Sequence, residues 1–74
     1  MPLPVIDPVR TGLNIKKLMK SKGITVKDLT EMFFFSNETA VYKWLRGATI
    51  PNVENMLALS TLFGVSMNEI LVKM

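Results

Sequence analysis

The stretch TVKDLTEMFFFSNETAVYKWLRG, residues 25–47, decides the fold because it holds two apolar repeats of helical spacing with a very short link between them. The repeats predict one helix over residues 26–33 and a second over residues 38–46. Since only residues 34–36 join them, the two helices must cross at a steep angle. This arrangement is expected to leave the outer face of the second helix exposed at the surface.

Capping residues and glycines mark the ends of these two helices. Thr25 is a favourable N-cap, and Asp28 follows in the first turn, where a negative charge suits the helix dipole. Asn37 is predicted to cap the second helix and Gly47 to end it. The side chains expected to face the core are Val26, Leu29, Met32, Phe33, Val41, Trp44 and Leu45.

Three further helices are predicted by the same combination of apolar spacing, caps and glycine stops. They cover residues 11–22 (starting at about Thr11 or Leu13) before Gly23, residues 53–63 after the cap Asn52, and residues 67–72 after the capping-box pair Ser66 and Glu69. No strand pattern competes. The predicted fold class is therefore all-α, a compact five-helix domain over residues 11–74. A proline-rich, extended arm over residues 1–10 is expected to precede it, with a turn near Asp7-Pro8.

Composition excludes several classes of function. The 74 residues contain no cysteine and no histidine, which removes disulfides, thiolate zinc sites and the commonest general base. No metal, cofactor or catalytic role is expected, and an enzyme is the weakest alternative. The longest apolar run, residues 32–35, is far too short to cross a membrane, and the first residues do not form a signal peptide. A reducing cytoplasm is the expected setting.

Positive charge is concentrated in the first two thirds of the chain. Residues 10–47 carry eight cationic and three acidic side chains, a net charge of +5, whereas residues 48–74 carry −1. Such a distribution suggests a polyanionic partner on one side of the domain, although lysines also serve simply to keep a small domain soluble.

The stretch from residue 14 to residue 72 resembles the phage repressor and Cro type (Xre-like) helix-turn-helix, a family of small bacterial transcriptional regulators. The matching pieces are NIKKLMKSKGIT, TVKDLTEMF, NETAVYKWLRG and IPNVENMLALSTLFGVSMNEIL, in that order of caps, glycines and apolar positions. The resemblance implies a repressor-like fold, sequence-specific binding to double-stranded DNA and action as a homodimer, with helix 38–46 in the major groove. The surface for dimerisation is expected at the fifth helix and the C-terminal apolar residues Ile70, Leu71, Val72 and Met74.

The same resemblance implies which residues meet DNA. The base-contacting positions are Glu38, Thr39, Tyr42 and Lys43, whose side chains suit base edges or, for Tyr42, a phosphate and its sugar. The phosphate-contacting positions are Thr25, Lys27, Arg46 and Asn52. The lysines of the first helix, Lys16, Lys17 and Lys20, are expected to form a solvated face that adds to the field without direct contacts.

Departures from the family pattern leave a second reading open. Val26 stands where relatives usually have a glutamine, the turn before the second of the two helices is one residue longer, and the loop 47–51 has no basic residue. An apolar pair, Met19 and Leu45, replaces a common ion pair, which need not weaken the fold. The alternative is a protein-interaction or antitoxin-like module with a partner at Phe34 or Phe35, of which one is expected to fill the core and the other to be exposed.

Overall fold

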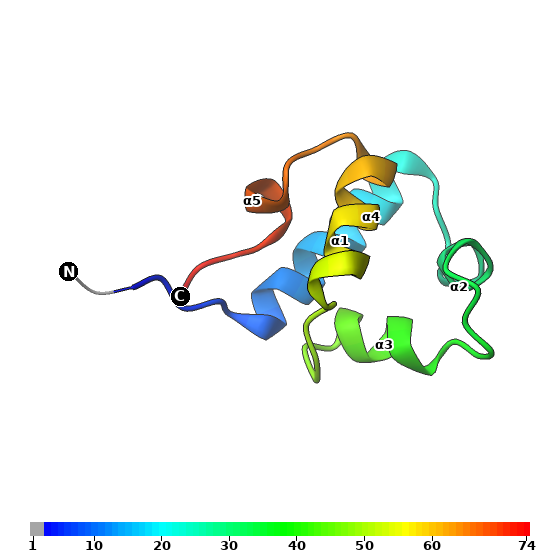
Figure 1. Cartoon of the computed structure of the whole chain (residues 1–74), viewed down its shortest axis with the longest axis horizontal. Coiled ribbons are helices and arrows are strands. Elements are labelled where there is room, and N and C mark those ends of the chain that lie inside the picture. The colour runs from blue at the N-terminus through cyan, green and yellow to red at the C-terminus, as the bar shows by residue number, and fades with distance from the viewer. Residues whose placement is uncertain (1–2) are drawn as a thin grey trace.

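Five helices make up the part of the chain that the computed structural model describes, residues 3–74. In chain order they are α1 (Pro8–Lys22), α2 (Val26–Met32), α3 (Thr39–Leu45), α4 (Val53–Phe63) and α5 (Met67–Ile70). In Figure 1, α1 and α4 overlap at the centre of the view, with α3 below them, α2 to the right and α5 to the left. The all-α, five-helix prediction is confirmed.

The core lies between α1, α3 and α4, with one side chain each from α2 and α5. Helices α1, α3 and α4 each contribute buried apolar residues at helical spacing. Burying a leucine or isoleucine side chain fully contributes about 1.5–3 kcal/mol. Trp44 is buried, as predicted, and its ring meets those of Phe33 and Phe35 edge-on, with centroids 5.7 Å apart in both pairs. The buried apolar residues are Ile15, Met19, Leu29, Val41, Trp44, Met56, Leu59, Phe63 and Ile70.

The predicted caps of α2 and α4 are present. The Thr25 hydroxyl accepts the N–H of Asp28 at 3.1 Å, and the Asp28 carboxylate accepts the N–H of Thr25 at 2.9 Å. The Asn52 side-chain oxygen accepts the N–H of Asn55 at 2.8 Å. These bonds satisfy N–H groups that have no partner inside their helices, which explains where both helices begin.

The start of α1 differs from the prediction. The helix begins at Pro8 with Asp7 as its N-cap, whose carboxylate accepts the N–H of Arg10 at 3.1 Å. A start at Thr11 or Leu13, after an arm extending to residue 10, was therefore wrong. Proline suits the first helical position because its missing N–H has no partner there and its φ is already helical.

The C-terminal helix is shorter than predicted. Helix α5 ends at Ile70, where the Asn14 amide donates to the carbonyl oxygens of Glu69 and Ile70 at 2.8 and 2.9 Å. Residues 71–74 then run extended, and the buried Thr11 hydroxyl accepts the N–H of Val72 at 2.9 Å. The prediction of a helix reaching Val72 was wrong because these contacts, with residues more than fifty positions away, fix the end of the chain.

The extended arm before α1 pairs with this C-terminal tail. The N–H of Asp7 donates to Val72 and that of Met74 donates to Val5, both at 2.8 Å, with an antiparallel bridge between Ile6 and Lys73. Figure 1 shows the extended segment before α1 and the C-terminal tail on the same side of the helical cluster. Residues 3–7 are thus extended as predicted, but they are tied to the body of the domain, and residues 1–2 of the predicted arm lie outside the described residues.

Candidate nucleic-acid interface

One face of α3 is uncovered by the rest of the domain. At about 100° per residue, Thr39, Tyr42, Lys43 and Arg46 fall within an arc of about 100°. All four side chains are exposed, Tyr42 by 50%. The opposite side of the helix carries the buried Val41 and Trp44. The structure therefore brings four of the eight predicted DNA-contacting residues together on one face.

Glu38 lies apart from that face. It is the N-cap of α3, one residue before the helix begins, and its side chain makes no capping hydrogen bond. The residue is half-buried and about a quarter turn from the centre of the exposed arc. Asn37, the expected cap, lies one position before Glu38, and its side-chain oxygen accepts the N–H of Thr39, the first residue of the helix, at 2.9 Å. Helix α3 is thus one residue shorter at each end than the predicted range 38–46.

The turn between α2 and α3 is held by aromatic rings. Phe33 and Phe35 both pack against the core beside Trp44, with their own centroids 5.5 Å apart. Phe34, between them, is 94% exposed and has φ of 56°, a left-handed conformation that bulky residues rarely adopt. The expectation that one of Phe34 and Phe35 packs inward while the other is exposed is confirmed.

Close backbone packing fixes α3 against α1. A Cβ atom added to Gly12 would overlap main-chain oxygens of Trp44 and Leu45. At the end of α3, Gly47 has φ of 79°, and a Cβ there would lie 2.6 Å from the Cα of Val9. Two glycines therefore let α1 hold α3 by its backbone, so the outer face of α3 is presented in one orientation.

The N-terminus of α2 lies next to the exposed face of α3. Thr25 and Lys27 are exposed there, as a phosphate contact requires. The carboxylate of Asp28 already accepts the N–H of Thr25, and its hydrogen bonding with Thr25 lowers the pKa of Asp28 below its ordinary value. An anion approaching this helix end would therefore use the N–H groups of Val26 and Lys27 and the Lys27 ammonium, since the N–H of Asp28 is engaged with Thr25.

A cleft joins this end of α2 to α1 and α3. Its lining comprises Leu13, Lys16, Val26, Tyr42, Leu45 and Arg46. The structure thus places Lys16 beside Tyr42 and Arg46, a proximity that sequence reasoning missed because only the packing of three helices creates it. Asn52, the last predicted phosphate contact, is exposed, and its side-chain oxygen is engaged in capping α4, so its amide group is what remains for a partner.

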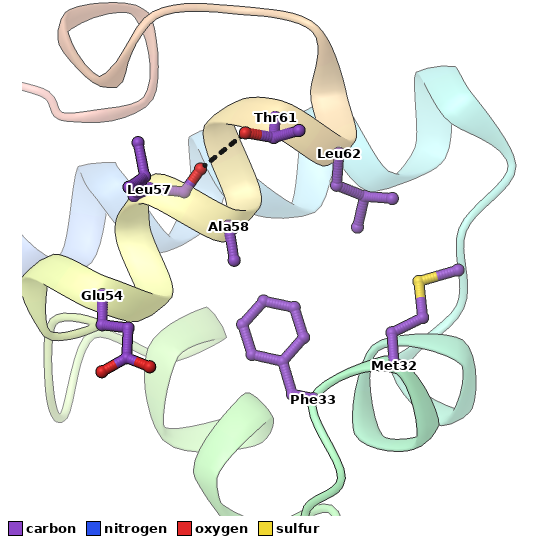
Figure 2. A pocket seen from close by; sticks show the side chains of 7 residues that line it. All are labelled: Met32, Phe33, Glu54, Leu57, Ala58, Thr61 and Leu62. Carbon is purple, nitrogen blue, oxygen red and sulfur yellow. Dashed lines mark hydrogen bonds between the residues drawn. The ribbon is translucent and has the colours of Figure 1, made fainter.

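A second, apolar groove lies between α2 and α4. Figure 2 shows the Phe33 ring pointing toward Ala58, with Met32 and Leu62 to one side and Glu54 and Leu57 to the other. Thr61 completes its lining, and the Thr61 hydroxyl donates to the carbonyl oxygen of Leu57.

Within residues 3–74, no group of carboxylates forms a potential metal site. None of the helices described has the length and apolar character needed to cross a membrane.

Comparisons with known proteins agree with this fold. A family model described as helix-turn-helix matches residues 15–70. The HTH-type transcriptional activator BcrR of Enterococcus faecalis is 33% identical over 57 residues, which are 77% of this chain. The chain spans only 28% of the length of that relative.

Solved structures show the same fold. The restriction-modification controller protein C.AhdI from Aeromonas hydrophila superposes with a TM-score of 0.74 at 23% identity, covering 86% of this chain and 96% of that one. The DNA-binding domain of BldD superposes with a TM-score of 0.72 at 18% identity, covering 89% and 94%.

Proposed function

Because this chain belongs to the helix-turn-helix family, we propose that it binds double-stranded DNA with sequence preference and regulates transcription. The observation that carries the proposal is the single uncovered face of α3, on which Thr39, Tyr42, Lys43 and Arg46 lie together. An α-helix fits the width of the major groove, where base edges present distinct hydrogen-bonding patterns. Helix α3 enters the groove with this face toward the bases.

The side chains on the face divide between two roles. Thr39 and Lys43 reach base edges, since a hydroxyl serves several bases and an ammonium donates to guanine O6 and N7. Tyr42 and Arg46 contact the backbone, as do Thr25 and Lys27 at the start of α2. The net charge of +5 over residues 10–47 supports this orientation, because it concentrates cations on the part of the chain that contains α1, α2 and α3.

The proposed assembly is a homodimer on a two-fold operator. Two copies related by a two-fold axis would place their α3 helices about 34 Å apart, one turn of DNA. Repression is the proposed effect, since a domain bound over an operator denies the same DNA to other proteins. The chain has a binding role without catalysis in this proposal, and it acts where the DNA is, in the cytoplasm.

A protein-interaction module is the second candidate function. The observation that favours it is Phe34, an aromatic side chain that is 94% exposed and held in a left-handed conformation. Apolar surface of this kind is typical of a contact with another protein. Capture of a partner in the absence of DNA by the wild type, and not by Phe34→Ser, would support this function.

Selection from a pool of random duplexes, followed by affinity measurements at several salt concentrations, tests the leading proposal. An enriched palindrome and an affinity that falls steeply with salt are expected, because binding releases counterions from the phosphates. Lys43→Ala should lower the affinity for the selected duplex, since a good base contact contributes about 1–3 kcal/mol. Failure of the wild type to enrich any sequence would contradict the proposal.

A matched pair of variants tests which end of α3 reads sequence. Thr39 lies on the exposed face and Glu38 lies beside it, half-buried. Thr39→Ala is therefore expected to change the sequence preferred in the selection, whereas Glu38→Ala should leave it unchanged. A change of preference only in the Glu38 variant would show that α3 meets DNA with a different face.

A further inference from the structure

The cleft at the junction of α1, α2 and α3 has a cationic rim and an apolar floor. Lys16, Tyr42 and Arg46 are exposed at its edge, whereas Val26 and Leu45 are half-buried beneath them. No acidic side chain lines it. The carboxylate closest in sequence to the floor, Asp28, is engaged with Thr25 at the start of α2. Two positive charges around an apolar floor favour an anion that carries an apolar group.

The position of the cleft connects it with DNA. Tyr42 and Arg46 belong both to the cleft and to the exposed face of α3, on which Thr39 and Lys43 also lie. When that face enters the major groove, the groove is bordered by a sugar–phosphate backbone. The part of the backbone that passes the α1 side of α3 would therefore reach the cleft.

We propose that this cleft binds one phosphate of the DNA backbone through Lys16 and Arg46, and that Lys16 is thus a direct DNA contact contributed by α1. The Tyr42 hydroxyl donates a third hydrogen bond to the phosphate. The adjoining deoxyribose lies on Val26 and Leu45, whose apolar side chains match its C–H surface. This inference rests on the proposed DNA binding and extends it to a helix outside the two-helix motif.

The chain offers a matched control for Lys16. Lys17 is the next residue of α1, carries the same charge and is also exposed. It lines a different hollow, together with Arg10, Leu13, Asn14 and Val72. Lys16→Ala and Lys17→Ala therefore change the net charge identically and differ only in which side of α1 loses its cation.

The experiment measures the affinity of each variant for a fluorescent duplex of the selected sequence and for a scrambled duplex, over a series of salt concentrations. Lys16→Ala is expected to lower the affinity for both duplexes about three- to tenfold. It should also reduce the slope of log affinity against log salt concentration by about 1, as loss of a phosphate contact does. Lys17→Ala should lower both affinities less than about twofold, because it changes only the overall electrostatic field of the domain. Equal losses in the two variants would overturn the proposal.

A second measurement identifies the phosphate itself. Duplexes with one neutral methylphosphonate, scanned along each strand, remove one backbone charge at a time. At the contacted position the wild type should lose the most affinity, whereas Lys16→Ala and Arg46→Ala should lose less, because each has already lost one of the contacts to that phosphate. If no position discriminates between the wild type and Lys16→Ala, the cleft binds no single phosphate.

The outcomes separate this inference from the function on which it rests. If the wild type binds neither duplex, DNA binding itself fails, and the cleft proposal fails with it. If the wild type binds and its two lysine variants are indistinguishable, DNA binding stands and only the role of Lys16 is refuted. Circular dichroism of each variant verifies that the fold is retained, as expected for exposed side chains.

Discussion

Gly12 and Trp44 touch through their backbones: a Cβ atom on Gly12 would overlap the carbonyl oxygen of Trp44 and would lie 2.6 Å from that of Leu45. Glycine is usually costly inside a helix because it has the most conformational freedom to lose. Here it is needed, since no other residue lets α1 approach the last turn of α3 so closely. The distance between these helices, and with it the placement of the outer face of α3, depends on this missing side chain together with the one at Gly47.

Gly12→Ala should therefore lower the free energy of unfolding by about 1–3 kcal/mol, the usual cost of forcing an extra group into a packed site. In an unhindered helix interior the same change raises stability by about 1 kcal/mol, so the sign of the effect is diagnostic. Urea denaturation measures it. Ser21→Ala, at an exposed position of the same helix, is the control and should change stability by less than about 0.5 kcal/mol. A more stable Gly12→Ala variant would mean that the two helices are not in backbone contact.

Phe34→Gly should be more stable than Phe34→Ala. Both remove the same exposed ring, but only glycine relieves the strain of a positive φ. The left-handed conformation costs an ordinary residue about 1–2 kcal/mol. The greater freedom of glycine in the unfolded chain offsets about 0.5–1 kcal/mol of that. The expected gain in the free energy of unfolding is up to about 1.5 kcal/mol, measured by denaturant titration, and a less stable glycine variant would contradict the left-handed turn.

Asp28→Asn should reduce the sensitivity of the fold to acid. The bonds from Thr25 lower the pKa of Asp28 in the folded state, so its contribution is present above the pKa of the unfolded chain, about 3.9. That contribution is lost as the pH falls through the lower, folded value. Thermal unfolding near neutral pH and in strong acid should show a smaller decrease in Tm for Asp28→Asn than for the wild type. Glu31→Gln, an exposed carboxylate of the same helix, is the control, and a decrease in Asp28→Asn equal to that of the wild type would refute the role of the cap.

Local signals predicted much of this fold. The caps Thr25 and Asn52 and the glycine after α1 act within a few residues of themselves, so their effect is visible in the sequence. The same holds for the two sides of α3, because a helical repeat alone separates buried Trp44 from exposed Lys43. The Asp7-Pro8 pair carries an equally local signal. It predicts a turn, but an N-cap followed by proline is also typical of a helix start, and this is the role of the pair at α1.

Features that depend on distant contacts were not predictable in this way. The tail leaves the helical conformation after Ile70 because Asn14 and Thr11 bind it from α1. Lys16 looks like any solvated lysine until three helices place it in a cleft with Arg46. Helix α3 likewise begins at Thr39, one residue later than its sequence predicts, and the DNA contacts expected of Glu38, Thr39, Tyr42 and Lys43 stay predictions.

The pairing of Ile6 with Lys73 has a consequence for the order in which the domain forms. Ile6 and Lys73 are separated by nearly the whole chain, so closing the loop between them costs the most conformational entropy. This contact is therefore expected to form last. During synthesis, residues 3–7 emerge before α1 and stay unpaired until residues 71–74 have been synthesised. We therefore expect the helices to assemble before the arm pairs with the C-terminal tail. The same pairing is expected to be the first part of the domain to open in local unfolding.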